Sequence, residues 1–203
     1  MKMWKLLGMC AIPFLILMGI ICYLLAWKYY GFNLVNNTIS DLGCKSVTKY
    51  YQLFNIGLII SGILLGCLFY GISLNLIRKF PNQPSVILSS IICVLFLTGW
   101  VGLICVGIFP GDGCLICHGT SAIITFVSLG IGEVLVGILH LINKHLRPES
   151  LIILPAFAVV AILFIYFSSK GKYPIFEWLF IILVIIWSYP LLADFYIEAL
   201  NIV

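Results

Sequence analysis

Residues 53–76 read LFNIGLIISGILLGCLFYGISLNL, an apolar run without a charged side chain. Because a helix rises about 1.5 Å per residue, a run of this length reaches across the roughly 30 Å hydrocarbon core of a bilayer. Backbone amides find no water in that core, so a spanning segment is either a helix or part of a closed barrel. The run lacks the alternation of apolar and polar residues that barrel strands show. We therefore predict a transmembrane helix here.

Five more apolar runs follow the same pattern, with short polar segments between them. The six expected helices span about residues 6–27, 53–76, 86–109, 120–142, 151–167 and 175–199. No linker, low-complexity tract or internal repeat interrupts this series. The sequence therefore predicts an all-α, polytopic integral membrane bundle of six transmembrane helices, with residues 1–203 forming a single membrane domain.

The composition excludes most other classes of protein. Of the 203 residues, 63% are hydrophobic and 9% are charged, whereas a soluble domain carries roughly 25% charged residues. The net charge of +4 is spread over the connecting segments instead of forming a basic patch, which argues against nucleic-acid binding. We expect membrane lipids, and in one hypothesis below other membrane subunits, as partners.

The polar segments indicate how the chain lies in the cell membrane. The side that carries the N-terminus and segments 78–79 and 144–147 holds slightly more Lys and Arg than the other. By the positive-inside rule, both termini are expected in the cytoplasm. Segments 28–52 and 110–119 then share the outer face, where Asn36, which begins an Asn-x-Thr sequence, would be open to glycosylation.

The first outward segment contains the run NNTISDLGC at residues 36–44. The side-chain oxygens of Ser40 and Asp41 make these residues candidates for a binding or catalytic site. The alternative is an ordinary loop in which Ser46 or Thr48 begins the second helix as its cap.

The second outward segment contains CLICH at residues 114–118. Cys-x-x-Cys-His is the attachment pattern of c-type haem, but a membrane edge gives a porphyrin little room, so we expect no cofactor and rank haem low. A disulfide between Cys44 and either Cys114 or Cys117 is the favoured use of these thiols, because all three lie on the predicted outward face. A zinc site at these thiols and His118 ranks as low as haem because ligands so close in sequence are cramped, and we predict no metal.

The fourth predicted helix carries a polar stripe. At about 100° per residue, its members fall within about a third of the helix circumference. They are His118, Ser121, Thr125, Glu133 and His140. Glu133 lies at the depth of the hydrocarbon core, so it should face the bundle interior, be paired, or be protonated. The stripe is either a path for protons or small solutes, or a packing feature in which Glu133 bonds to Trp100, Thr98 or a backbone carbonyl.

These features together resemble a known family. NTISDLG at residues 37–43, FPGD at residues 109–112 followed by His118, and Glu177 at the opening of the last helix are similar to the membrane family known as domain of unknown function 998. The resemblance covers most of the chain and implies a six-helix fold and a bacterial or archaeal source, without a settled activity. The family's usual Glu-Arg pair is Glu177-Trp178 here, so a role that needs the arginine is not implied.

Three functions remain open on this evidence. A lipid-head-group-binding or lipid-modifying site could use Ser40, Asp41, Asp112, His118 and Glu177, because carboxylates beside a histidine suit acid–base chemistry or metal binding. A structural or accessory subunit of a membrane complex would use the same cluster only to brace its loops. Proton or small-solute transport would follow the polar stripe. We rank the accessory subunit first, lipid chemistry second and transport third, and the sequence leaves open whether the chain is an enzyme.

Overall fold

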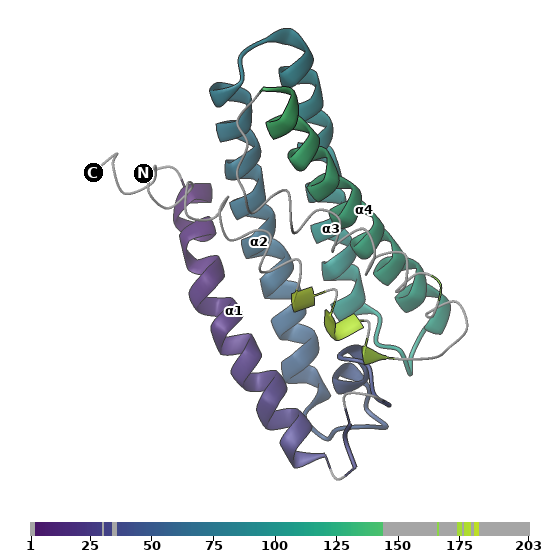
Figure 1. The fold of residues 1–203 in the computed structure, drawn as a ribbon. Coiled ribbons are helices and arrows are strands. Elements are labelled where there is room, and N and C mark those ends of the chain that lie inside the picture. The colour runs from purple at the N-terminus through teal and green to yellow at the C-terminus, as the bar shows by residue number, and fades with distance from the viewer. Residues whose placement is uncertain are drawn as a thin grey trace.

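Figure 1 shows the computed structural model, in which long helices run up and down beside one another. The structure describes residues 3–29, 31–33, 36–143, 166, 174, 175, 177–179, 181 and 182. In chain order its elements are α1 (Met3–Lys28), the short 3-10 helix η1 (Ser40–Gly43), α2 (Tyr51–Lys79), α3 (Gln83–Ile108) and α4 (Leu115–Ile142). Every regular element among these residues is helical, as predicted. The expected helix at 151–167 and most of that at 175–199 lie outside the described residues, so the structure supports four spanning helices and not the count of six.

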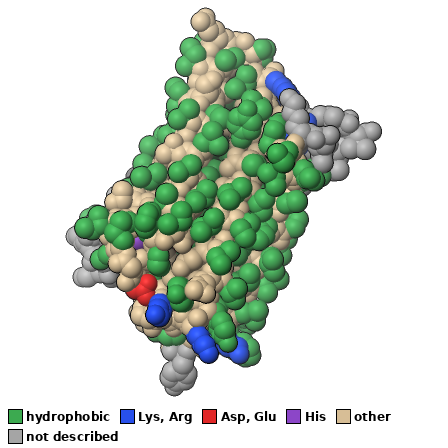
Figure 2. All heavy atoms as spheres, turned by 180° about the vertical axis from the view of Figure 1, so that it is seen from behind, with side chains coloured by type: hydrophobic (Ala, Val, Ile, Leu, Met, Phe, Trp, Pro, Cys, Tyr) green, Lys and Arg blue, Asp and Glu red, His purple; other side chains and the backbone are tan. Residues whose placement is uncertain are grey.

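The four long helices are long and apolar enough to cross a membrane. Each carries large apolar side chains that are exposed on the molecule, such as Ile16, Ile63, Val94 and Ile123. Figure 2 shows such side chains over most of one face, with charged side chains toward its ends. Exposed apolar surface on this scale suits lipid and not water. The chain is therefore a membrane protein, while the side on which its termini lie stays a prediction.

Small residues let neighbouring helices approach closely. α1 packs on α2, α2 on α3, and α3 on α4. A Cβ atom at Gly62 of α2 would lie 2.5 Å from Ile104 Cγ1 of α3, and one at Gly102 of α3 would lie 2.6 Å from Thr125 Oγ1 of α4. Helix packing in lipid depends on such close contacts because no hydrophobic effect drives the helices together there.

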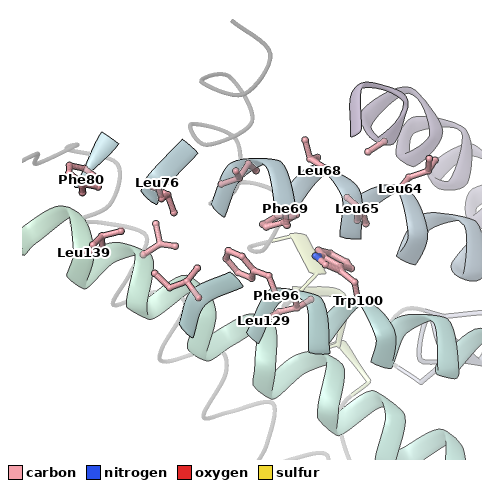
Figure 3. Close-up of a cluster of buried hydrophobic side chains, with 14 residues drawn as sticks. Leu64, Leu65, Leu68, Phe69, Leu76, Phe80, Phe96, Trp100, Leu129 and Leu139 are labelled. Carbon is pink, nitrogen blue, oxygen red and sulfur yellow. The ribbon is translucent and has the colours of Figure 1, made fainter. Parts of the chain in front are cut away.

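The core lies where α2, α3 and α4 meet (Figure 3). Phe69 of α2 makes an edge-to-face contact with Phe96 of α3, with ring centroids 4.7 Å apart, and its centroid lies 5.2 Å from that of Trp100. Aromatic pairs in this geometry contribute about 0.5–1.5 kcal/mol beyond their buried area. This aromatic cluster fixes the orientation of α2 against α3.

Each of the four long helices begins two to five residues before the position that hydrophobicity predicted. α4 begins at Leu115 instead of 120, so the Cys-x-x-Cys-His run lies in its first turns and not in a loop. An apolar run marks only the part of a helix that lies in the hydrocarbon core. The helical backbone hydrogen bonds can continue into the head-group region, so the helix can be longer than the run. The proposed caps of α2 are also wrong: its N-cap is Tyr50, without a side-chain cap, and Thr48 Oγ1 accepts a hydrogen bond from the Tyr50 amide at 3.3 Å.

The polar segments gather at the two ends of the bundle. At one end, the Ser46 amide donates to Asp112 Oδ2 at 3.0 Å, which joins the segment before α2 to the turn before α4. At the other end, Asn82 Nδ2 donates to Asn143 Oδ1 at 2.9 Å, which joins the start of α3 to the end of α4. The segment before α2 and the turn before α4 thus lie at the same end of the bundle, while the side of the membrane that this end faces stays a prediction.

Candidate functional site

The segment around η1 folds into a small hydrogen-bonded unit. The Thr38 amide donates to Asp41 Oδ2 at 2.8 Å, and the Asp41 amide donates in return to Thr38 Oγ1 at 3.2 Å. This reciprocal pair is the arrangement of a capping box, here around a single short turn. Thr38 Oγ1 also lies 3.0 Å from Ser40 Oγ. These bonds hold Asp41 and Ser40 in fixed positions.

Glu177 meets this unit from the far end of the sequence. Its side chain is 9% exposed, and its carboxyl lies close enough to Ser40 and to the charge of Asp41 for both to affect its pKa. Glu177 is outside the four spanning helices and level with the loop that contains η1. The structure thus brings together Ser40, Asp41 and Glu177, three of the five candidate residues.

The surroundings of Glu177 change its affinity for a proton. Burial, and next the negative charge of Asp41, raise the pKa of Glu177 to about 8, against the opposing effect of the Ser40 hydrogen bonds. Two nearby carboxyls with unlike environments are typical of acid–base pairs, in which one holds a proton and the other accepts one.

Aromatic side chains line the same junction. Trp178 Nε1 donates to the Asn37 carbonyl at 3.1 Å. Its ring makes an edge-to-face contact with Phe32, with centroids 6.2 Å apart, and Phe32 makes a similar contact with Tyr29. These contacts hold Trp178 against the loop that contains η1, so aromatic rings form part of the same junction.

Asp112 is bonded to a different part of the first loop from this pair. Its carboxylate is exposed and accepts the Ser46 amide. The charges of Asp112 and Asp41 both act on the buried Cys44, whose thiol has a raised pKa mainly because of burial. Asp112 and Asp41 therefore both lie near Cys44, but each is bonded to a different backbone amide, that of Ser46 and that of Thr38.

His118 makes its side-chain hydrogen bond to a backbone carbonyl and not to one of the candidate carboxyls. It is half-buried in the first turns of α4, and its Nδ1 lies 2.8 Å from the Phe109 carbonyl oxygen. Across the described ranges, no three His, Cys, Asp or Glu side chains lie close enough to hold a metal ion. As placed, His118 orients the turn between α3 and α4.

The disulfide differs from the predicted pairing. Cys114 bonds to Cys117, and Cys44 remains a thiol. The helix start explains the difference, because it brings residues three apart into reach of each other within one turn. In the chain-entropy model, so short a loop contributes about 2 kcal/mol, against about 4 kcal/mol for the long loop that a Cys44 link would close. The pairing also engages both thiols that covalent haem attachment would need.

Of the five residues in the polar stripe of α4, four are buried and His118 is half-buried. Ser121, Thr125, Glu133 and His140 are buried, with Glu133 only 1% exposed. Neither suggested side-chain partner serves Glu133: Thr98 Oγ1 donates to the carbonyl of Val94 in its own helix, and Trp100 Nε1 makes no hydrogen bond within the described structure. A role of the stripe in transport stays a prediction.

The sequence indicates Thr38 as a side-chain oxygen donor group of this loop and Trp178 as an interfacial aromatic residue, but it does not predict their supporting contacts. Thr38 and Trp178 position Asp41 and Glu177. The spacing Thr38-x-x-Asp41 was a usable signal, because a threonine three residues before an acid predicts a capping box. Asn36, the glycosylation candidate, is exposed in the same loop, which fits the hypothesis without testing it.

Comparison with known proteins gives one match. A family model described as "Protein of unknown function (DUF998)" matches residues 10–194. No curated protein and no solved structure matches the chain.

Proposed function

The chain belongs to the DUF998 family of unknown function, and from this premise we propose that it binds the head group of a membrane lipid through Asp41 and Glu177. The observation that carries the proposal is the buried carboxyl of Glu177, which lies near Ser40 and the second carboxyl of Asp41. A brace between two segments would avoid placing two acids together, because like charges oppose each other. Perturbed carboxyl pairs are more typical of binding and catalytic sites.

The chemistry of this junction favours a head group with a positive charge. Asp41 supplies a negative charge, and Phe32 and Trp178 supply aromatic rings. Carboxylates and aromatic faces are the groups that bind quaternary ammonium ions in proteins. Glu177 adds a proton that it can give to a head-group oxygen, so the site is suited to acid–base chemistry on a bound lipid.

The test compares lipid retention by purified full-length protein in mixed micelles. Native mass spectrometry would measure binding of phosphatidylcholine, whose ammonium does not titrate, against phosphatidylglycerol. We expect preference for the choline lipid and a roughly 10- to 100-fold loss of it in Asp41→Asn, the range of a charge-assisted interaction. Glu177→Gln should bind nearly as well as the wild type at pH 7, because a neutral amide resembles a protonated carboxyl.

Asp112→Asn is the matched control, because it makes the same change at the same end of the bundle but outside the pair. Equal retention of both lipids by the wild type, or an equal loss in Asp112→Asn and Asp41→Asn, would reject the proposal.

An accessory role is the second candidate, and a different observation favours it. Asp112 and His118 are engaged with the Ser46 amide and the Phe109 carbonyl, which is how bracing residues behave. Native gels after mild extraction test this role: a larger complex that Asp112→Ala disrupts supports it, and a chain that migrates alone counts against it.

A further inference from the structure

A disulfide opens α4 at the end of the bundle that also carries the head-group site. Cys114 is the N-cap of this 28-residue helix, and Cys117 lies in its first turn. The Cys117 amide donates a hydrogen bond to Cys114 Sγ at 3.2 Å. None of the residues assigned to lipid binding takes part in this bond, so its role is a separate question.

The position of this bond is a poor one for a structural staple. It joins residues three apart, which the helix already holds together because the His118 amide donates to the Cys114 carbonyl at 2.9 Å. The turn before α4 is tied to the first loop by another contact, that of Ser46 with Asp112. The disulfide therefore links no two elements that would otherwise separate.

The bond is also accessible to a reacting thiol. Both cysteines are half-buried and not enclosed. The two residues between them, Leu115 and Ile116, are 72% and 82% exposed. An attacking group can approach across this apolar surface, which also offers a place for an apolar segment of a partner to rest.

The helix start favours the thiolate that reduction would produce. After reduction, the Cys117 amide can donate to a Cys114 thiolate, and the positive end of the helix dipole adds to this effect. Cys44 provides a contrast on the same end of the bundle. It is buried against the turn at Gly111, and burial raises its thiol pKa, so it stays a protonated, slow thiol.

We propose that the Cys114–Cys117 disulfide is a thiol–disulfide exchange site that oxidises a dithiol carried by a partner protein. One partner thiolate attacks Cys114 Sγ, the bond to Cys117 breaks, and the Cys117 thiolate takes up a proton. The second partner thiolate then attacks the partner sulfur of the mixed disulfide and expels the Cys114 thiolate. The partner loses two electrons and two protons and becomes a disulfide, while Cys114 and Cys117 become a dithiol.

The first test measures reversible reduction of the full chain in nanodiscs. The protein is equilibrated in glutathione redox buffers, quenched with acid, and labelled with a maleimide polymer that shifts its gel mobility. We expect a reversible gain of two labelled thiols within the range of glutathione buffers, with unchanged helical circular dichroism. Cys44→Ser should keep this gain, and the double variant Cys114→Ser/Cys117→Ser should lack it. A bond that stays oxidised in every buffer, or a reduction that unfolds the helices, would overturn the proposal.

The second test assigns the attacked sulfur and the partner class. Each single variant keeps one of the two thiols, which can form a mixed disulfide with an oxidised two-cysteine peptide. We expect this mixed disulfide to form at least 10-fold faster at Cys114 in the Cys117→Ser variant than at Cys117 in the Cys114→Ser variant. For the wild-type disulfide, the double variant Leu115→Ser/Ile116→Ser should slow oxidation of a reduced peptide with apolar flanks more than it slows reaction with glutathione. Equal trapping rates would overturn the role of Cys114, and equal slowing of both reductants would overturn the docking of an apolar protein partner.

Discussion

Replacing Glu177 by glutamine should remove a large pH dependence from the stability of the protein. The folded state holds the carboxyl of Glu177 buried, beside Ser40 and Asp41, with a pKa of about 8 against an ordinary value of 4.5. An unfolded chain restores the ordinary value. The folded state therefore binds the proton more tightly than the unfolded state does over this interval.

The sign and size of the effect follow from proton linkage. A carboxyl with a raised pKa contributes stability that is complete below pH 4.5 and is lost as the pH rises through about 8. Each pKa unit corresponds to about 1.4 kcal/mol, so the loss between these limits amounts to at most about 5 kcal/mol. Because glutamine does not titrate, the Glu177→Gln variant should lack this loss of stability over the same pH range.

The assay is unfolding by SDS titration in mixed micelles, followed by circular dichroism at intervals from pH 4.5 to 9. Asp41→Asn should flatten part of the slope because it removes the charge that helps to raise the pKa of Glu177, and Asp112→Asn should retain the full slope. An equal slope in the wild type and in Glu177→Gln would refute the placement of this carboxyl.

Three further predictions concern the bundle itself. Gly102→Ala should lower the free energy of unfolding by about 1–3 kcal/mol, because the added Cβ overpacks against α4. The control is Gly19→Ala, which should leave the free energy of unfolding level or raise it slightly, because a Cβ there meets nothing within 4 Å. SDS titration compares the two variants. Asn82→Ala should cost about 1 kcal/mol in the same assay, because the side chain caps α3 by accepting the Ser85 amide, and a cost near zero would contradict that role. Single cysteines at positions 46 and 112 should react with an impermeant maleimide from the same side of sealed vesicles, and a single cysteine at position 82 should react from the opposite side. Labelling of Ser46→Cys and Asp112→Cys from different sides would contradict the fold.

Sequence alone predicted the features that repeat along the chain. Hydropathy located four helices, because the hydrocarbon core imposes a minimum length on every span. The angle of about 100° per residue placed Ser121, Thr125, Glu133 and His140 on one face, and burial confirms that this face is internal. The family resemblance is confirmed by the match over residues 10–194.

Features that depend on a single contact could not be predicted in the same way. Whether Cys114 pairs with Cys44 or with Cys117 depends on where α4 begins, and apolarity does not record helix ends in the interface. The contact of Glu177 with Ser40 joins residues far apart in sequence, and no periodic pattern specifies such a pair. The sequence therefore predicted that the five candidates lie at one end of the bundle. It did not predict that Asp112 and His118 bond to backbone groups there while Glu177 lies beside Ser40.

The docking of residues 177–178 on the first loop is the claim on which the carboxyl pair depends, and cross-linking tests it most directly. In a background whose native cysteines are replaced, the pair Ser40→Cys/Glu177→Cys should form a disulfide on mild oxidation, as should the pair Ser46→Cys/Asp112→Cys, which serves as the positive control. A cross-link in the control pair with none between positions 40 and 177, even with a short bifunctional maleimide, would contradict the account.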